Sequence, residues 1–570
     1  MKITRIIIHN YRSIIDADLK IDDSTLLVGA NNAGKSNVIN AIRAFYDDLR
    51  WTNADFPKSD AIDDSAWVKI YFSLTDSEWN NLADDYKNEN NPNTLILIRR
   101  FKGEKAKSTQ SNIYAIVDEV ENEKLFYGAK NVGIAKAGEV IYVPAISLSS
   151  DQMKTSGPSP FRETINTLFK KVVSQSTAYE KLVNAFEDLN TEVSVNSDGA
   201  FFEISEEINR SLSDWEIRLQ LNINPIKFED ITKSLVQTSF FDEKLGSEIE
   251  LRNYGEGFQR SLIYEIIKIA ASQKEVKESS KKEFSSETKI LLFEEPEAFL
   301  HPSQQELMAY NLRKLAEMDD WQVIMTTHSP TFISKNNDQI NQIIKVEKES
   351  CVSEFYQLDK NSQRYLTSAG IDFIDEIQAF VNDSNIAAAD KSKAKQMLRG
   401  DISDDSAAQF DRFRYQMWLD TEKASMFFAD LVLLVEGATE RALFNLLLSD
   451  RWNDLAKKRI LVVNMLGKYN AHRYMRLLEA FGIKHGVILD DDNQEKHHGV
   501  INMFMESHKN EFTVADIKFF GGCLEDFLGI VEDKRSDRKP LSVLKALEDG
   551  DIPDKKLDEL KTLFCEALAL

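Results

Sequence analysis

Residues 24–45 read STLLVGANNAGKSNVINAIRAF and indicate what kind of domain begins the chain. The apolar run Ser24–Val28 is followed by the pattern G-x-x-x-x-G-K-S and then by Ser36–Phe45, where apolar residues recur with helical spacing. A strand, a glycine-containing loop and a helix in this order attract phosphate, because backbone N–H groups and the helix N-terminus point at it. The sequence therefore predicts an α/β domain that binds ATP.

The predicted nucleotide site takes its chemistry from three segments of the chain. Lys35 would reach the β- and γ-phosphates, and Ser36 would offer a hydroxyl to Mg²⁺. A second apolar strand ends in Glu294, which would hold Mg²⁺, and in Glu295, which would polarise the attacking water. His328, after a third apolar strand, would sense the γ-phosphate or hydrogen-bond the water. The loop residues expected to contact ATP are Gly29, Asn31, Asn32, Gly34, Lys35, Ser36 and Asn37.

A second acidic group follows two apolar strands near the C-terminus. The strand DLVLLV ends in Glu436, with Glu440 one helical turn later, and the strand VIL ends in Asp490, Asp491 and Asp492. Because neighbouring parallel strands end at the same edge of a sheet, Glu436, Asp490 and Asp492 are predicted to gather around one or two Mg²⁺ or Mn²⁺ ions. Asp491 alternates away from them. Metal ions held in this way can activate water for phosphodiester hydrolysis.

Composition limits the class of protein. The chain has 570 residues, of which 42% are hydrophobic, so it can form packed cores and is not disordered. Its net charge of −23 argues against a protein that coats DNA non-specifically, although it allows a local basic groove. Three distant cysteines indicate neither a disulfide framework nor a zinc site. Without a signal peptide or a membrane-length apolar run, we expect a cytoplasmic protein with no membrane partner.

Changes in pattern along the chain predict five regions. They are an N-terminal lobe of the ATP-binding domain (1–149), a mostly helical insertion expected to mediate dimerisation (150–245), a C-terminal lobe of the same domain (246–345), a linker region (346–425) and a second α/β domain (426–570). The first lobe is expected to contain a mostly antiparallel sheet, built from the runs Trp67–Leu74, Thr94–Arg100, Ile113–Val117 and Val140–Val143. A further strand pair is expected at Arg218–Ile223 and Glu248–Arg252.

Four motifs together resemble an ABC-type ATPase head of the RecF and SMC branch, in which two heads enclose two ATP molecules. They are GANNAGKS (29–36), YGEGFQRS (254–261), LLFEEPEAFLHP (291–302) and TTHSP (326–330). The resemblance implies that Gly255, Gly257 and Gln259 meet the γ-phosphate of the opposite protomer and that Arg12 contacts nucleotide. Glu294 stands where the family usually has Asp, and Gly255 where it has Ser. These departures predict ATP binding and dimer gating with slow turnover.

The C-terminal motifs FFADLVLLVEGATE (427–440), VILDDD (487–492) and CLEDFL (523–528) resemble the Rossmann-like TOPRIM fold. An ATPase head followed by TOPRIM is the architecture of the OLD (overcoming lysogenization defect) nucleases. Their relatives include the nuclease subunit of the Gabija anti-phage system and retron-associated OLD-like effectors. The resemblance implies a catalytic set of Glu436, Glu440, Asp490, Asp492, Glu525 and Lys539, with Asp526 assisting. The implied metal ligands are Ser36 and Glu294 in the head, and Glu436, Asp490, Asp492 and Glu525 in TOPRIM.

The function predicted from these motifs is an ATP-regulated, metal-dependent DNA endonuclease or nickase that acts against phage. We expect a homodimer or homotetramer, and a co-encoded partner such as a helicase or a retron reverse transcriptase with its DNA. Two alternatives stay open: a ribonuclease that cuts tRNA or other RNA, and an ATP-dependent sensor or scaffold whose TOPRIM domain holds a partner. No motif indicates whether ATP activates or inhibits cleavage.

Overall fold

The computed structural model describes most of the chain outside the predicted insertion. The described residues are 1–107, 110–128, 137–145, 240–249, 286–333, 339–397, 404–491, 496–533, 535 and 537–570, with short pieces between 181 and 284 that include helix α6 (Ala200–Ser211). Two compact units result: one contains Met1–Val140, Glu283–Glu297 and Pro302–Leu570, and the other Ile141–Lys282 with Ala298–His301. Among the described helices, none is both long and apolar enough to span a bilayer.

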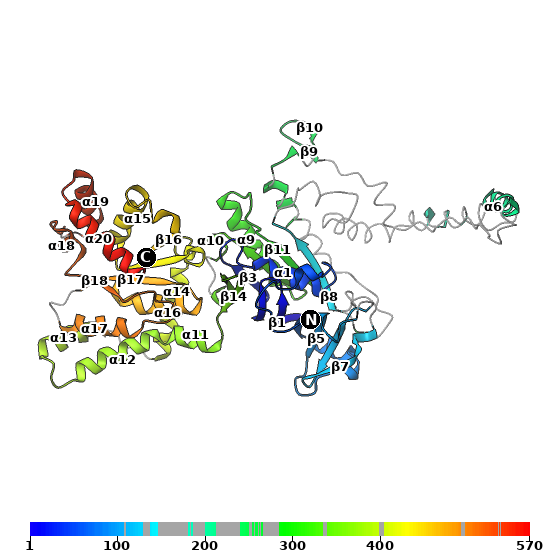
Figure 1. Cartoon of the computed structure of the whole chain (residues 1–570), viewed down its shortest axis with the longest axis horizontal. Helices are drawn as coiled ribbons and strands as arrows, with labels where there is room; N and C mark the ends of the chain where they lie inside the picture. Colours follow the sequence, from blue (N-terminus) through cyan, green and yellow to red (C-terminus); the bar gives the residue numbers. More distant parts are fainter. Residues whose placement is uncertain are drawn as a thin grey trace. The chain divides into compact units, whose positions relative to one another are not determined.

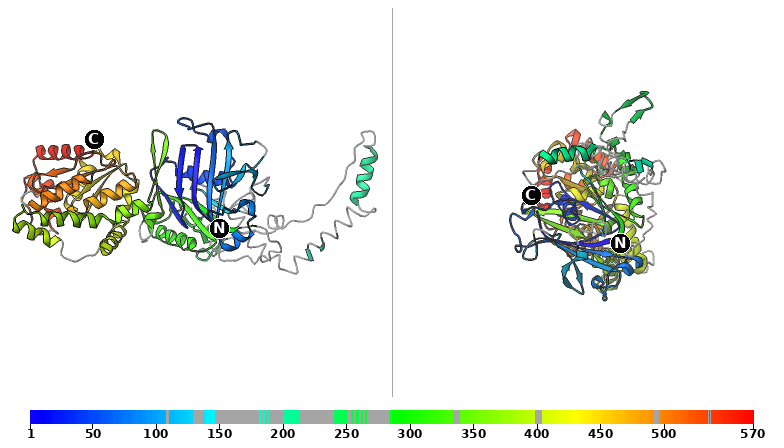
Figure 2. Two further views of the ribbon diagram at one scale, coloured as in Figure 1. Left: turned by 90° about the horizontal axis from the view of Figure 1, so that it is seen from below. Right: turned by 90° about the vertical axis from the view of Figure 1, so that its right-hand side faces the viewer.

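A six-stranded antiparallel sheet forms the first layer of the head (Figure 1). Its order is β2-β1-β4-β5-β6-β7, from strands β1 (Lys2–Tyr11), β2 (Ile14–Lys20), β4 (Ala66–Ser73), β5 (Thr94–Lys102), β6 (Ile113–Val117) and β7 (Val120–Leu125). In the left view of Figure 2 its blue and cyan strands lie side by side. The burial of β4 alternates along the strand, as expected where one face of a sheet covers a core. The predicted antiparallel lobe is confirmed for β4, β5 and β6.

A second six-stranded sheet carries the predicted phosphate loop. Its order is β14-β13-β3-β12-β11-β8, from strands β3 (Ser24–Val28), β8 (Ala137–Val143), β11 (Ser286–Glu294), β12 (Trp321–Thr327), β13 (Ile343–Glu349) and β14 (Val352–Gln357). The strands β13, β3, β12 and β11 are parallel, and β14 is antiparallel to β13. Every residue of β3 and β12 is buried, which explains their unbroken apolar runs. Helix α1 (Lys35–Phe45) contacts β1 and β4 of the first sheet and β12 of the second.

The prediction that Val140–Val143 joins the antiparallel lobe is wrong. The structure places this run in β8, at the edge of the parallel sheet beside β11. Gly138 has φ +93°, and a Cβ there would lie 2.9 Å from the carbonyl oxygen of Thr288 in β11. The close approach of the two backbones therefore needs glycine, and this tertiary reason leaves no periodic signal in the sequence.

The predicted insertion (150–245) and its strand at Arg218–Ile223 lie largely outside the described residues. The second unit contains one described hairpin, in which β9 (Phe240–Asp242) pairs antiparallel with β10 (Ser247–Ile249). Thus β10 overlaps the run Glu248–Arg252 predicted as a strand at Glu248 and Ile249, and its described partner is β9.

The C-terminal sheet is parallel throughout, in the order β16-β15-β17-β18. Its strands are β15 (Leu431–Val435), β16 (Ile460–Asn464), β17 (His485–Asp490) and β18 (Lys518–Phe520). Its helices include α15 (Ala438–Asp450), α16 (Ala471–Ala480), α17 (Lys496–Ser507), α18 (Leu524–Leu528), α19 (Lys539–Asp549) and α20 (Asp554–Ala567). A continuous core joins the sheet to α15 and α20, with Leu433, Phe444, Phe520 and Phe564 fully buried. The predicted strands that end at Val435 and Asp490 are both confirmed.

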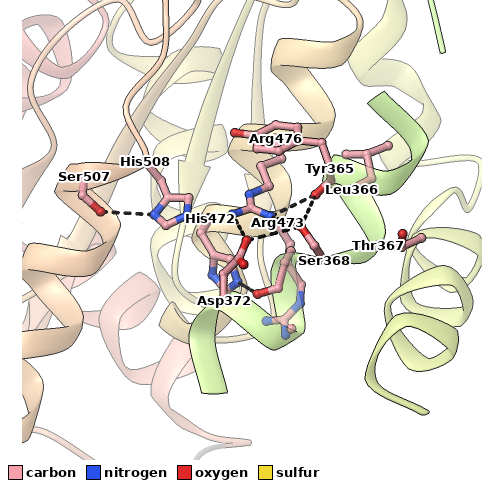
Figure 3. A network of polar contacts seen from close by, with 12 residues as sticks. Tyr365, Leu366, Thr367, Ser368, Asp372, His472, Arg473, Arg476, Ser507 and His508 are labelled. Atoms are coloured by element: carbon pink, nitrogen blue, oxygen red, sulfur yellow. Dashed lines mark hydrogen bonds and ion pairs between the residues drawn. The ribbon is translucent and has the colours of Figure 1, made fainter. Parts of the chain in front are cut away.

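Two buried arginines of α16, Arg473 and Arg476, bind three helices of the predicted linker region, and Figure 3 shows the contacts of Arg476. They are α11 (Lys360–Thr367), α12 (Ala369–Asn382) and α14 (Asp404–Trp418). The Arg476 guanidinium donates to the Tyr365 carbonyl at 2.9 Å and to Asp372 at 2.5 Å. His508 Nδ1 donates to the Phe504 carbonyl, so its Nε2 accepts from Arg476 at 2.9 Å. Burial lowers the pKa of His508, which keeps it neutral in this role.

Asp411 on α14 is fully buried and accepts three hydrogen bonds. Its partners are Arg473 Nε on α16 (2.8 Å), Gly370 N on α12 (2.5 Å) and Arg414 Nη1 (2.7 Å). We expect Asp411→Ala to lower the free energy of unfolding by about 3 kcal/mol, because it leaves the buried Arg473 charge unpaired. Urea denaturation would measure this change.

The matched control for that variant is Asp430→Ala. Asp430 pairs with Arg459 at 2.7 Å, but both side chains are about half exposed to solvent. An exposed pair of this kind contributes less than about 1 kcal/mol. Equal losses in the two variants would show that the Asp411 network does not hold the linker helices on α16.

Candidate functional site

Two glycines shape the phosphate loop between β3 and α1. Gly29 has φ +143°, and a Cβ there would collide with the carbonyl oxygen of Val346 in β13. Gly34, the residue before α1, has φ +114°, and a Cβ there would collide with the hydroxyl of Ser353 in β14. Both positions therefore need glycine for conformation and for space. The loop is held closely against neighbouring strands, as a rigid phosphate cradle requires.

Lys35 is buried in this loop, with 6% of its surface exposed. Its Nζ donates to the carbonyl oxygens of Gly29 at 3.0 Å and Ala30 at 2.9 Å. Burial lowers the pKa of Lys35 to about 8, against the opposing effect of nearby carboxylates, of which Glu295 is the strongest. The ammonium is therefore still mostly protonated at neutral pH and lies near the acidic residues that end β11.

The predicted acidic pair and histidine meet where β11 and β12 end. Glu294 is the last residue of β11, 7% exposed, and lies opposite Thr326 in the parallel register. Glu295 has φ +44°, and its backbone N–H donates to the Thr326 carbonyl at 2.9 Å. This backbone turn brings Glu295 Oε1 to 3.3 Å from His328 Nε2. The structure thus brings Glu295 and His328 together, while their part in ATP hydrolysis stays a prediction.

Glu297 is a further buried carboxylate that the sequence analysis missed. It is 8% exposed, and its Oε1 accepts the backbone N–H of His328 at 2.5 Å. Burial raises the pKa of Glu297, while the hydrogen bond from His328 lowers it. Its charge also acts on Lys35. Glu297 is the third Glu of the EEPE segment, which was the only hint in the sequence that it could have a role. The contact by which it fixes the backbone at His328 appears only in the folded turn.

Arg12 lies beside α1 and is held by Asp55. Its Nε donates to Asp55 Oδ1 at 2.8 Å, and its Nη1 lies 3.5 Å from Asn37 Oδ1 on the first turn of α1. Asn31 and Asn32 in the loop and Ser36 in the first turn of α1 are exposed. The structure therefore groups Arg12 and Asn37 beside the phosphate loop, and their contact with nucleotide stays a prediction.

The predicted signature residues lie in the second unit. A Cβ at Gly257 would lie 2.5 Å from the Phe299 carbonyl oxygen, so glycine is needed there for close packing. Gln259 is 2% exposed, and its Nε2 donates to the Tyr254 carbonyl at 2.7 Å. For Gly255, the space that a Cβ would occupy is open. In this structure the Gln259 side chain supports its own turn, and a contact of these three residues with a second protomer stays a prediction.

In the C-terminal domain, the acidic residues after β15 and β17 come together. The backbone N–H of Asp490 lies 3.4 Å from Glu436 Oε2. Glu440 is 7% exposed, and its Oε2 accepts the Gly437 N–H at 3.0 Å, so it also caps α15. Burial raises the pKa of Glu440, and the negative charges of Glu436 and Glu525 raise it further. These carboxylates are therefore close enough to repel one another.

Glu525 and Lys539 complete the described part of this group. Glu525, on α18, is 5% exposed, and its Oε1 is buried without a hydrogen-bond partner among the described residues. Lys539 begins α19 and pairs with Glu532. This pairing raises the pKa of Lys539, and the charge of Glu525 contributes in the same direction. Asp526 lies beside Glu525 on α18, and a Cβ placed at Gly522 would lie 2.9 Å from its Oδ2.

The donor chemistry of the cluster suits a hard divalent cation. Several carboxylates share one place, and the buried Glu525 oxygen has an unused acceptor position. Within the described residues, which leave out 492–495, no three acidic, histidine or cysteine side chains form a complete metal site. Asp492, predicted as a ligand, belongs to the residues left out. The carboxylates of Glu436, Asp490 and Glu525 are the kind of ligand that a divalent ion prefers, although these three described residues do not by themselves form a group that could hold one.

Asp491 and Lys468 are the two other residues at the end of β17. The Asp491 N–H donates to the Phe520 and Gly522 carbonyls. The Asp491 carbonyl oxygen and Oδ1 accept from the Asn502 amide, so Asp491 contacts Asn502 rather than Glu436, as the alternation along the strand predicted. Lys468 was not predicted. Its Nζ donates to the Asp490 carbonyl at 2.6 Å. No spacing rule links it to the acidic motifs, because it follows β16, a strand that the sequence analysis did not identify.

Comparison with known proteins supports the division into two sites. The family described as AAA ATPase domain matches residues 1–333, and the family described as overcoming lysogenization defect protein-like, TOPRIM domain, matches residues 427–492. A protein named Old nuclease, from Escherichia phage P2, is 25% identical over 533 residues, which is 90% of this chain and 79% of that protein. A protein named Endonuclease GajA, from Bacillus cereus (strain VD045), is 24% identical over 520 residues, 87% of this chain and 76% of that protein.

Among solved structures, an SMC head bound to the C-terminal winged-helix domain of ScpA covers 64% of this chain and 100% of its own, with 17% identity. Its TM-score of 0.38 is too low to carry an argument. The two family matches, with the sheets described above, confirm the predicted ATPase head followed by a TOPRIM domain.

Proposed function

The chain belongs to the AAA ATPase domain family, and from this premise we propose that it is an ATP-regulated DNA endonuclease that needs a divalent metal ion and acts in defence against phage. The TOPRIM match and the relatives named Old nuclease and Endonuclease GajA support the nuclease activity. The observation that carries the proposal is the meeting of Glu436 with the end of β17 at Asp490, because it joins two strand-end acidic motifs in one site.

The residues of this site divide the work of phosphodiester hydrolysis. Glu436, Asp490 and Glu525 would hold the divalent ion, which when bound supplies an activated water and a charge for the leaving oxygen. Glu440 positions Glu436 by fixing the backbone at Gly437, the residue between the strand and α15. Lys539 lies near Glu525, where its ammonium would offset charge on the scissile phosphate.

The proposal assigns ATP a regulatory part. Lys35, Glu294 and Glu295 form a nucleotide site in the head, at the ends of β3 and β11, and the carboxylate cluster belongs to a different sheet. ATP would therefore change the head and, through it, the access of DNA to the nuclease site. The Mg²⁺ or Mn²⁺ requirement, the assembly of two or four copies and a co-encoded partner belong to the same proposal.

Plasmid cleavage by the purified chain tests the function. Supercoiled plasmid, linear duplex and total RNA would be incubated with Mg²⁺ or Mn²⁺ across a range of ATP concentrations, beside samples with EDTA. We expect conversion of supercoiled plasmid into nicked or linear product, reduced at least about a hundredfold by EDTA, because water activation depends on the metal ion. The ATP series gives the sign of the regulation.

Three results would contradict the proposal. Cleavage that continues in EDTA would reject the metal-dependent mechanism. Cleavage of RNA alone would replace the DNA endonuclease with a ribonuclease. Failure to cut any of the three substrates at any ATP concentration would favour a sensor or scaffold over an enzyme.

A further inference from the structure

Lys468 is a buried cation in the nuclease site proposed above. It lies in the short helix η10 (Lys468–Asn470), after β16, and only 2% of its surface is exposed. Lysine is almost never buried to this degree unless it is paired, because removing an ammonium from water is costly. Its Nζ donates to the carbonyl oxygen of Asp490 at 2.6 Å. The buried ammonium therefore donates to the last residue of β17, which also contacts Glu436.

The loop that carries Lys468 is built onto the strand ends. The Gly467 N–H donates to the Glu436 carbonyl at 2.9 Å, and Gly467 has φ +109°, a conformation that favours glycine. Leu466 has φ +59°, and its N–H is held by the Asn464 side chain at 2.8 Å. The loop therefore contacts the end of β15 through Gly467 and the end of β17 through Lys468.

Two lysines lie near acidic residues of the site, and they differ in burial. Lys539 pairs with Glu532, has a side chain that is 32% exposed, and acts on Glu525. Lys468 is buried and acts at Asp490. An exposed lysine can move to meet a phosphate, whereas a buried one has a fixed position. The two lysines therefore suit different tasks. Of the two, only Lys539 was predicted from the sequence to belong to the nuclease site.

We propose that Lys468 is a positioning residue of the nuclease site: it holds the end of β17 so that Asp490 stays against Glu436, and it supplies a fixed positive charge within the carboxylate cluster. The proposal rests on the proposed nuclease function. A fixed ammonium has two opposite consequences. It keeps the carboxylates in place for cleavage, and it also repels the divalent ion that they bind. Loss of Lys468 should therefore separate the rate of cleavage from the affinity for metal.

The test is Lys468→Met, which removes the charge and keeps the length of the side chain. Metal-dependent plasmid cleavage should fall about a hundredfold, because catalytic groups displaced by about 1 Å lose that much rate. Mn²⁺ affinity, measured by electron paramagnetic resonance without substrate, should rise about tenfold, because a like charge has left the site. ATP hydrolysis should stay within about twofold, which shows that the chain is folded. A residue that only stabilised the fold would not raise the affinity for metal.

The matched control is Lys518→Met, in the neighbouring strand β18. Lys518 forms a partly exposed ion pair with Glu566, at 2.8 Å, and neither residue belongs to the proposed nuclease site. Cleavage and Mn²⁺ affinity should both match the wild type. If Lys468→Met does not fold, Lys468→Arg keeps the charge and should retain cleavage within about tenfold of the wild type.

Four results would overturn the proposal. They are cleavage by Lys468→Met within threefold of the wild type, loss of Mn²⁺ binding together with cleavage, unchanged Mn²⁺ affinity, and an inactive Lys468→Arg with normal ATP hydrolysis. Failure of the wild type to cleave is a different result, because it rejects the proposed function itself. The Mn²⁺ measurement still tests the fixed charge in that case, since it needs no substrate.

Discussion

Asp490→Ala is expected to reduce DNA cleavage at least about a thousandfold while ATP hydrolysis stays within about twofold. A thousandfold loss corresponds to about 4 kcal/mol of transition-state stabilisation, which is the order expected when a metal ligand is removed. Asp490 ends β17, its N–H faces Glu436, and its carbonyl oxygen accepts from Lys468, so its backbone is held between these two residues. Gel analysis of nicked plasmid and release of phosphate from ATP measure the two activities on the same preparation.

Asp516→Ala is the control for Asp490→Ala. Asp516 is an aspartate of the same domain, 80% exposed at its side chain, and it pairs with Lys509. Its loss should leave both activities unchanged. If Asp490→Ala still cut DNA, or lost ATP hydrolysis while cleavage continued, the assignment of the two chemistries to two separate sites would be wrong.

Lys35→Ala is expected to weaken ATP binding at least about a hundredfold and to remove detectable ATP hydrolysis. The ammonium donates to two carbonyl oxygens of the loop and lies in the field of the carboxylates at and after the end of β11, so its position is set by the loop itself. A buried, charge-assisted contact of this kind with phosphate is far stronger than an exposed one. Fluorescence titration with a labelled ATP analogue would measure the affinity.

Lys314→Ala is the control for Lys35→Ala. Lys314 lies on α9 (Pro302–Ala316) of the same head and forms an exposed pair with Glu317 at 2.7 Å. ATP should bind this variant as tightly as the wild type. The plasmid assay on Lys35→Ala then isolates regulation: the rate of cleavage, whatever its level, should no longer respond to ATP. Unchanged ATP affinity in Lys35→Ala would reject the phosphate-loop assignment.

The elements that could be predicted from sequence are those with a strong local signal. The run Ile113–Val117 became β6 with the predicted bounds, and the predicted strand VIL lies within β17, because each is a short apolar segment between polar turns. The motif GANNAGKS lies between β3 and α1 for the same reason. In these segments the pattern of a few neighbouring residues is sufficient, since burial follows from the segment itself.

Other features depend on contacts between distant residues, and no local pattern reports them. The place of β8 in the second sheet follows from the approach of Gly138 to Thr288. The parts played by Glu297 and Lys468 appear only when the turn after β11 and the loop after β16 are folded. Glu440 was expected as an acidic motif residue, and the structure adds that it caps α15. The sequence thus predicts the strands that precede the candidate site residues better than the contacts that hold those residues in place.

Arg473 and Arg476 of α16 pair with residues of α14 and α12, and these pairs affect which part of the chain could be transferred to another protein during evolution. A gene fusion that took the chain from residue 427 onward would inherit Arg473 and Arg476 without Asp411 and Asp372, their partners on the earlier helices. Such a fragment would carry two cations in an apolar setting and would be selected against. A fusion that began before α11 would inherit both pairs. Recombination is therefore expected to transfer α11, α12, α14 and α16 together with the C-terminal sheet. This unit is larger than residues 427–492, which match the TOPRIM family.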